Sequence, residues 1–176
     1  MKGTEVLIKG CSPWSGKKGV VVACDIHSDN TPYGDGDYNV FRVRLGDGTV
    51  TKWLPERWIQ VIPKSQIIYV SGPYSADTLD GKLQNTQTAI DVGIELIRKG
   101  HVVIIPHLSH YTDMRAQEKD IDIPWSEWMR QDLAILEKCD ALYYIAPSRG
   151  ADIELARAKE LGLKIYYSVD EVPEAN

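Results

Sequence analysis

Hydrophobic residues along the first 62 positions come in short runs broken by polar residues, a pattern typical of β-strands. The clearest run is residues 38–45, in which apolar and polar side chains alternate with a period of two. Gly46 and Gly48 predict a tight hairpin directly after it. Five strands are expected, at residues 6–8, 19–23, 38–45, 49–54 and 58–62. So many short strands in so few residues predict a small SH3-like β-barrel over residues 1–63.

After residue 66 the pattern changes to strand-sized apolar runs that alternate with helical ones. Strands are predicted at 67–70, 102–105, 141–146 and 164–169, and helices at 84–99, 124–138 and 151–161. Five apolar positions of the first helix share one face and are expected to pack on the core: Ala89, Ile90, Gly93, Ile94 and Ile97. Alternation of this kind produces a parallel sheet with right-handed crossovers. Residues 64–176 are therefore expected to form an α/β domain, a flavodoxin/Rossmann-like parallel sheet with helices on both faces.

Composition and charge narrow the classes of function. The 176 residues are 43% hydrophobic and 26% charged, as in folded proteins. Apolar runs are strand-sized, the N-terminus carries no secretory signal, and the three cysteines form no CxxC pair. We therefore expect a cytoplasmic protein with no membrane partner and no disulfide scaffold. The net charge is −5, and the acidic C-terminal part argues against wholesale binding of duplex nucleic acid.

Ligands of parallel sheets bind beyond the carboxyl ends of the strands. In the segment that follows the third predicted strand of this domain, Ser148 and Gly150 precede a helix, and the free N–H groups of a helix start favour an anion. Glu154 lies about one turn into that helix, within reach of the crevice. The alternative is that Ser148 or Asp152 caps the helix and Glu154 is a solvated acid stabilised by the helix dipole.

Other polar residues near the strand ends also have two interpretations. Asp132 stands beside an apolar helix face, so it points either into the crevice or toward water. His107 and His110, with Asp113 nearby, have the spacing to begin a zinc site, but a catalytic zinc wants three protein ligands. Contacts to a ligand or loop hydrogen bonds are expected for both histidines instead. The turn at residues 72–75 lacks the glycine patterns of dinucleotide folds and P-loops.

Taken together, these segments resemble the nucleoside 2-deoxyribosyltransferase-like superfamily, in particular its small bacterial and phage members. The resemblance covers about residues 67–172 and rests on an ordered set of features rather than on one motif. The features are YVSGPYSA at 69–76, Asn85, Gly100-His101, IPHLSH at 105–110, Trp125-x-x-Trp128-x-x-x-Asp132-Leu133 with Cys139-Asp140, and Ser148-x-Gly150-x-x-x-Glu154.

The resemblance implies an enzyme that cleaves the N-glycosidic bond of a (2′-deoxy)nucleoside or nucleoside 5′-monophosphate and passes the sugar to water or another base. It implies Glu154 as the nucleophile at the anomeric carbon and Asp132 as the residue that holds or protonates the departing base. Substrate binding would fall to Ser71, Gly72, Tyr74, His107, Ser148 and Gly150. The resemblance further implies a homo-oligomer that works without metal or organic cofactor.

The alternative function is a non-catalytic nucleotide-binding or sensor module whose output is read through the N-terminal barrel. The resemblance does not extend to that barrel, so binding of a protein or of single-stranded nucleic acid stays open for it. Its aromatic and basic residues form either a stacking and phosphate surface or a barrel core with a solvated rim: Trp14, Trp53, Trp58, Lys17, Lys18, Arg42 and Arg44. The base, the sugar and the need for a 5′-phosphate are not fixed by the sequence.

Overall fold

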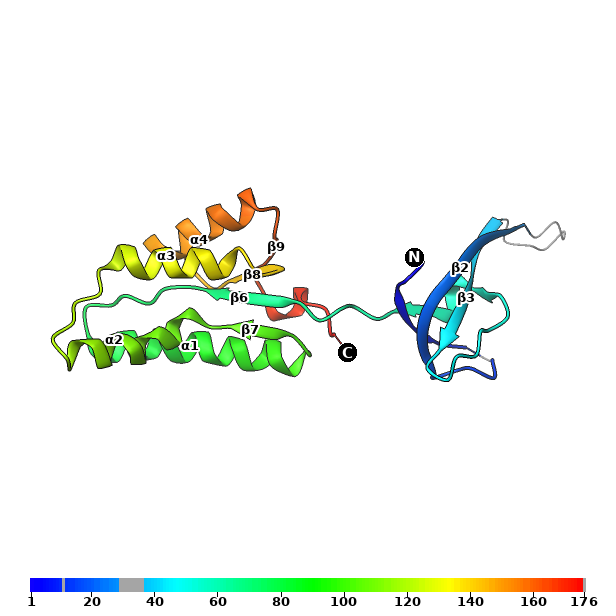
Figure 1. Cartoon of the computed structure of the whole chain (residues 1–176), viewed down its shortest axis with the longest axis horizontal. Coiled ribbons are helices and arrows are strands. Elements are labelled where there is room, and N and C mark those ends of the chain that lie inside the picture. Colours follow the sequence, from blue (N-terminus) through cyan, green and yellow to red (C-terminus); the bar gives the residue numbers. More distant parts are fainter. Residues whose placement is uncertain (11, 29–36, 176) are drawn as a thin grey trace. The chain divides into compact units, whose positions relative to one another are not determined.

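The computed structural model describes residues 1–10, 12–28 and 37–175. The chain forms two compact units, unit 1 at Met1–Lys64 and unit 2 at Ser65–Ala175 (Figure 1). In the described part of the chain, no helix combines the length and the apolar character needed to cross a membrane.

Unit 1 contains a five-stranded antiparallel sheet in the order β4-β3-β2-β1-β5. The strands are β1 (Glu5–Ile8), β2 (Lys18–Ser28), β3 (Asp37–Leu45), β4 (Leu54–Pro55) and β5 (Ile59–Val61), with a 3-10 turn at Glu56–Trp58 before β5. The long β2–β3 hairpin carries an irregularity between Val21 and Ala23, where its register shifts. Its inward side chains form a core with residues of β1 and β4: Val6, Ile8, Val21, Phe41, Val43, Leu45 and Leu54.

The prediction of a strand at residues 49–54 was wrong for most of these residues. Only Leu54 belongs to a strand, and the preceding residues contribute one isolated bridge, between Arg44 and Val50. The Thr51 hydroxyl accepts the Val43 N–H at 3.0 Å. This side-chain bond stands where a continuing ladder would use a backbone carbonyl, which explains why the hairpin partner does not extend.

The three tryptophans of unit 1 take different positions. Trp14 and Trp58 pack against the core of the unit. Trp53 is 46% exposed, and the Arg42 guanidinium carbon lies 5.9 Å from the centroid of its ring. Trp14 and Trp58 therefore fit the core interpretation, whereas Trp53 keeps an open aromatic face beside a cation.

Unit 2 contains a four-stranded parallel sheet in the order β7-β6-β8-β9. Its strands are β6 (Ile67–Ser71), β7 (Val102–Ile104), β8 (Ala141–Tyr144) and β9 (Lys164–Tyr166), and its helices are α1 (Leu79–Arg98), α2 (His110–Gln117), α3 (Trp125–Leu136) and α4 (Arg149–Glu160). Short 3-10 turns lie at Pro106–Ser109 and Val169–Glu171. The predicted α/β class is confirmed, and α2 is an addition to the expected elements.

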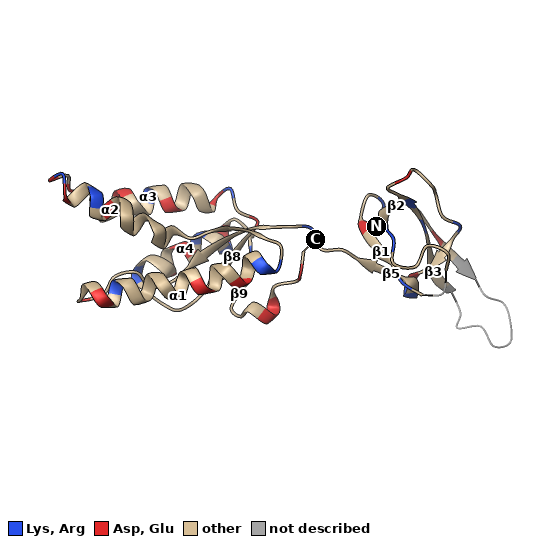
Figure 2. Cartoon of the chain, turned by 90° about the horizontal axis from the view of Figure 1, so that it is seen from below, with Lys and Arg blue, Asp and Glu red and all other residues tan. Residues whose placement is uncertain are grey.

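Side chains of β6 alternate between the two faces of this sheet. Ile68 and Val70 pack with buried residues of α1, whereas Tyr69 packs with buried residues of α3 and α4. Figure 1 shows α1 on one side of the sheet and α3 and α4 on the other. Charged residues are concentrated on the helices and are few on the strands of the sheet (Figure 2). The sheet is thus the buried central layer of unit 2.

The buried face of α1 differs from the expected one. The helix begins at Leu79 rather than at residue 84, and its buried residues are Thr86, Ala89, Gly93 and Leu96. Ile94 and Ile97 are 48% and 56% exposed, so the prediction was wrong for these two positions. A Cβ atom on Gly93 would lie 2.4 Å from the Cδ1 atom of Ile105. Small residues therefore let the helix approach the sheet closely, and this contact sets which face is buried.

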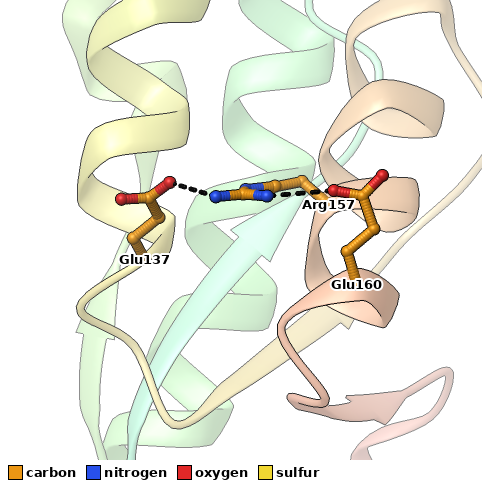
Figure 3. Close-up of polar contacts among 3 residues, drawn as sticks. All are labelled: Glu137, Arg157 and Glu160. Atoms are coloured by element: carbon orange, nitrogen blue, oxygen red, sulfur yellow. Dashed lines mark hydrogen bonds and ion pairs between the residues drawn. The ribbon is translucent and has the colours of Figure 1, made fainter.

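On the other face of the sheet, Arg157 links α3 to α4. Its guanidinium lies 2.6 Å from the carboxylate of Glu137, the residue after α3, and 3.0 Å from that of Glu160 (Figure 3). The hydrogen bond from Arg157 lowers the pKa of Glu137. All three side chains are partly exposed, so these ion pairs contribute little to stability.

Candidate active site

A pocket of about 540 Å³ lies beyond the carboxyl ends of β6, β7 and β8. Residues that follow these strands line it together with residues of α2, α3 and the segment between these two helices. The lining includes seven of the eight predicted site residues: Gly72, Tyr74, His107, Asp132, Ser148, Gly150 and Glu154. The eighth, Ser71, is the last residue of β6 and is 1% exposed. The structure therefore brings all eight to one edge of the sheet.

Glu154 is held in place by two hydroxyl groups of β6. The Tyr69 hydroxyl donates to Oε1 at 2.7 Å, and the Ser71 hydroxyl donates to Oε2 at 2.5 Å. Tyr69 and Ser71 are two positions apart on the strand, so both side chains reach the same face of the sheet. Glu154 is 6% exposed, so it is not the solvated first-turn acid of the alternative interpretation. Its carboxylate is fixed in orientation by donors to both oxygen atoms.

Burial is the largest influence on the charge of Glu154. It raises the pKa of the carboxyl group to about 7, against the opposing effect of the Ser71 and Tyr69 hydrogen bonds. The charge of Asp132 raises this pKa further. Burial, and then the charge of Glu154, raise the pKa of Tyr69 above its ordinary value, so its hydroxyl stays protonated and remains a donor.

Asp132 is the second carboxylate of the pocket. It lies on α3, is partly buried and lines the pocket. Of the two interpretations from the sequence, the one that points Asp132 into the crevice therefore holds. Burial raises the pKa of Asp132 to about 6. The pocket thus contains two carboxyl groups that exchange protons near neutral pH, and their titrations are coupled through the interaction of their charges.

Ser148 both lines the pocket and caps a helix. It is the N-cap of α4, and its hydroxyl accepts the Ala151 N–H at 3.2 Å. Asp152 instead accepts a hydrogen bond from the Tyr144 hydroxyl at 2.5 Å. A Cβ atom on Gly150 would meet only the Met129 sulfur, at 3.6 Å, which is an ordinary contact. Packing within the chain does not require glycine at this position, so the small residue leaves room on the ligand side.

The histidines hold the loops that follow β6 and β7. His107 Nε2 lies 3.0 Å from the carbonyl oxygen of Pro73, and His110 Nδ1 lies 2.8 Å from the Tyr74 hydroxyl. Burial lowers the pKa of His107. Within the ranges that the structure describes, no group of three or more His, Cys, Asp or Glu side chains is arranged to hold a metal ion. Both histidines make loop hydrogen bonds, one of the two alternatives that the sequence left open, and contact of either with a ligand stays a prediction.

Several pocket residues were missed or interpreted differently from the sequence. Tyr69 looked like an ordinary strand residue, although a buried tyrosine hydroxyl needs a partner and this need points to a polar neighbour. Trp125 and Trp128 carried part of the resemblance but were not predicted as site residues, and both line the pocket. The Arg149 guanidinium lies 4.1 Å from the centroid of the Trp125 ring, so a cation and an aromatic face meet at the pocket edge.

A comparison with protein families finds a match to the family described as Domain of unknown function (DUF4406), over residues 66–167. The match covers more than half of the chain. The chain belongs to the DUF4406 family. The DUF4406 segment contains all eight predicted site residues and Tyr69, but it ends before the last turn at Val169–Glu171 and excludes unit 1. A search of curated proteins finds no match to this chain.

Proposed function

We propose that the DUF4406 domain of this chain cleaves the N-glycosidic bond of a (2′-deoxy)nucleoside or nucleoside 5′-monophosphate. The observation that carries the proposal is the state of Glu154, a buried carboxylate with a hydroxyl donor on each oxygen. It shares its pocket with Asp132, a second carboxyl group with a raised pKa. A pair of carboxyl groups that flank one site is the usual arrangement in enzymes that carry out displacement at a sugar anomeric carbon.

In the proposed reaction, one carboxylate oxygen of Glu154 attacks C1′ of the sugar while the bond from C1′ to the base nitrogen breaks. The electron pair of that bond stays on the base, which takes a proton from Asp132. The product of this step is an ester between Glu154 and the sugar. Asp132 then accepts a proton from water as the water oxygen attacks C1′ and releases Glu154. A second base in place of water makes the reaction a transfer.

The productive protonation state has Glu154 ionised and Asp132 protonated, so the pair carries one proton. Burial raises the pKa of Glu154 to about 7 and that of Asp132 to about 6, so a single proton is expected on the pair between these two values. In the free site this proton lies mainly on Glu154, and the reaction proceeds from the minor form in which it lies on Asp132. Positive charge that develops on the sugar stabilises ionised Glu154 and favours the proton on Asp132. The two hydroxyl donors also bind the charged form of Glu154, and the pKa of about 7 already includes their effect.

The strand order supports the finer assignment of unit 2 to the flavodoxin-like folds and to the nucleoside 2-deoxyribosyltransferase-like superfamily. Counted within unit 2, β7-β6-β8-β9 is the order 2-1-3-4, which changes direction between β6 and β8. Ligands of doubly wound sheets bind at such a switch point, and both Ser71 and the loop before α4 lie there. For unit 1 we propose an SH3-like barrel, supported by its five short antiparallel strands.

A homo-oligomer is the proposed state in solution. The exposed isoleucines of α1, Ile94 and Ile97, support it together with Val102 on the edge strand β7. These residues lie on α1 and β7, which pack against each other, and a contiguous exposed apolar patch is typical of a protein–protein contact. The size of the assembly is measured by light scattering coupled to size-exclusion chromatography.

The test of the proposed reaction is chromatography of free bases after incubation with a panel of nucleosides and 5′-monophosphates. Wild type should release base, and Glu154→Gln should release none while it keeps the fold. Glu160→Gln, an exposed residue on the same helix, is the matched control and should release base like wild type. A new nucleoside formed with a second base present would identify a transferase.

Tight binding of a nucleotide without release of base would instead support the sensor function. In that case Glu154→Gln would change affinity only, and the output would have to pass through unit 1.

A further inference from the structure

Unit 1 carries cations that no carboxylate of the described residues neutralises. Residues 1–64 contain nine Lys and Arg against seven Asp and Glu, whereas the rest of the chain is acidic. All ion pairs between described residues lie in unit 2. Within the described residues, the Lys and Arg side chains of unit 1 therefore keep charges that an anionic partner can neutralise.

Arg42 and Arg44 place two of these cations on the outward face of β3. Both are exposed, and Val43 between them belongs to the core, so the two arginines share the opposite face of the strand. Their cross-strand partners on β2 are uncharged, Ala23 and Val20. The two arginines begin about 7 Å apart along the strand, a separation that lets neighbouring phosphate groups of one nucleic-acid backbone each meet a guanidinium.

Trp53 adds an open aromatic ring beside Arg42. The tryptophan is 46% exposed, although this residue type is largely buried in most proteins. The Nε atom of Arg42 donates to the carbonyl oxygen of Thr51 at 3.3 Å, and its guanidinium carbon lies 5.9 Å from the centroid of the Trp53 ring. An aromatic face beside a positioned cation can stack an unpaired base while the cation meets its phosphate.

A hollow of about 450 Å³ continues this face from β3 across β2 and β1. Arg44, Val20 and Glu5 lie side by side on the three strands and line it. Val20 and Val22 are half-buried and supply apolar surface. Lys18 adds a cation to the lining, so Lys18 and Arg44 outweigh the charge of Glu5. The hollow therefore has room for a base next to the arginines.

The surface formed by these groups consists of Lys18, Val20, Arg42, Arg44 and Trp53. We propose that it binds single-stranded nucleic acid, with a base stacked on Trp53 and phosphates on the two arginines. This inference goes beyond the proposed function of unit 2 and does not rest on it. The bases of a single strand are open to stacking, whereas those of a duplex are not. An acidic protein segment would meet the cations but would leave the Trp53 ring without a stacking partner.

The test measures binding of the full chain to fluorescein-labelled oligodeoxythymidine and oligouridine of about ten nucleotides, by fluorescence anisotropy. For wild type, Kd should rise about 5- to 20-fold between about 50 and 200 mM salt, as two or three phosphate contacts predict. Trp53→Ala should weaken binding about 5- to 100-fold, and Trp53→Phe, which keeps a ring, should weaken it less. Arg44→Gln should lower the slope of log Kd against log salt by about 0.7, the effect of one phosphate contact.

Arg98→Gln is the matched control, because it removes the same charge from an exposed position in unit 2, and it should bind the oligomers like wild type. The proposal is overturned if wild type binds neither oligomer at the lower salt concentration, or if Trp53→Ala and Arg44→Gln bind like wild type. Equal affinity for duplex DNA of the same length also overturns it. Displacement of the oligomer by a poly-glutamate peptide as readily as by unlabelled oligomer would assign the surface to acidic protein segments instead. Should Trp53→Ala fail to fold, Trp53→Phe and Arg44→Gln give the decision.

Failure of this proposal is distinguishable from failure of the proposed reaction. Neither Trp53 nor Arg44 lines the pocket that contains Glu154, so Trp53→Ala and Arg44→Gln should release base from free nucleosides like wild type. If wild type releases no base from any substrate, the proposed reaction fails, and the affinities for the oligomers still decide on the surface of unit 1.

Discussion

Replacement of Glu154 by Gln should remove a pH-dependent cost of folding. In the folded chain, burial raises the pKa of this carboxyl group from its ordinary value of 4.5 to about 7. Below about pH 4.5 the group is protonated in both the folded and the unfolded chain, so it has no effect. As the pH rises toward 7, the unfolded chain loses the proton while the folded chain keeps it, and stability therefore falls.

The size of this effect follows from the difference between the two pKa values. One pKa step is worth about 1.4 kcal/mol, so the cost levels off at about 3 kcal/mol once both states are ionised. Between pH 5 and pH 8, wild type should lose about 2 to 3 kcal/mol of stability that Glu154→Gln does not lose. Asp132 is present in both proteins, so its own cost of burial cancels, and the difference between them contains the Glu154 carboxyl group together with its charge interaction with Asp132.

The assay is urea denaturation at pH 5, 6, 7 and 8, followed by NMR signals from β6 and β8 so that unit 2 is observed alone. Two units in one chain make a single overall unfolding free energy ill-defined, which is why the local signals are needed. Glu160→Gln controls for an amide substitution on an exposed position of the same helix. A stability difference between wild type and Glu154→Gln that is the same at pH 5 and pH 8 would refute the buried-carboxylate argument.

Three further predictions concern the hydroxyl donors, the carboxylate pair and the packing of α1. Tyr69→Phe and Ser71→Ala each remove a hydrogen-bond donor to Glu154, so each should raise the pKa of Glu154 and lower base release at pH 7 about tenfold. A pH–rate profile checks this, and a profile that does not shift contradicts it. For wild type, kcat/KM should be bell-shaped with its maximum between pH 6 and 7, because Glu154 and Asp132 must share one proton; a profile that rises steadily to pH 9 would argue against Asp132 as the acid. Gly93→Val should destabilise unit 2 by about 1 to 3 kcal/mol, because a Cβ atom there would lie 2.4 Å from Cδ1 and 3.1 Å from Cγ1 of Ile105, and the valine methyl groups need further room. Thermal unfolding measures this, and an unchanged midpoint would show that the Ile105 side chain or the helix gives way.

The class of unit 2 could be predicted because it depends on local patterns. Apolar runs of strand length and helices between them are visible in the sequence, and parallel strands bring their carboxyl ends to one edge. This geometry is why residues as far apart in the sequence as Gly72 and Glu154 were expected at one site, and why both line the same pocket. The alternation of side chains along β6 also places the hydroxyl groups of Tyr69 and Ser71 on the same face of the sheet. Only Ser71 was predicted as a site residue from the sequence.

The buried face of α1 could not be predicted because it depends on tertiary packing. The helix has apolar residues on more than one side, and hydrophobicity alone favoured Ile94 and Ile97. The structure buries Ala89, Gly93 and Leu96 instead, since small side chains allow the closer approach to the sheet. Similarly, the polar composition of residues 107–123 concealed α2, whose formation places Asp113 and Gln117 on the pocket wall.

The central claim is that Glu154 forms a covalent bond to the sugar, and the stereochemistry of transfer tests it most directly. Wild type is incubated with a 2′-deoxynucleoside, whose base is attached in the β configuration, and with methanol as a small acceptor. Two successive displacements at C1′ predict the β-methyl glycoside in the proton NMR spectrum, and none with Glu154→Gln. The α-methyl glycoside from wild type, or a β product that persists in Glu154→Gln, would contradict a Glu154 nucleophile.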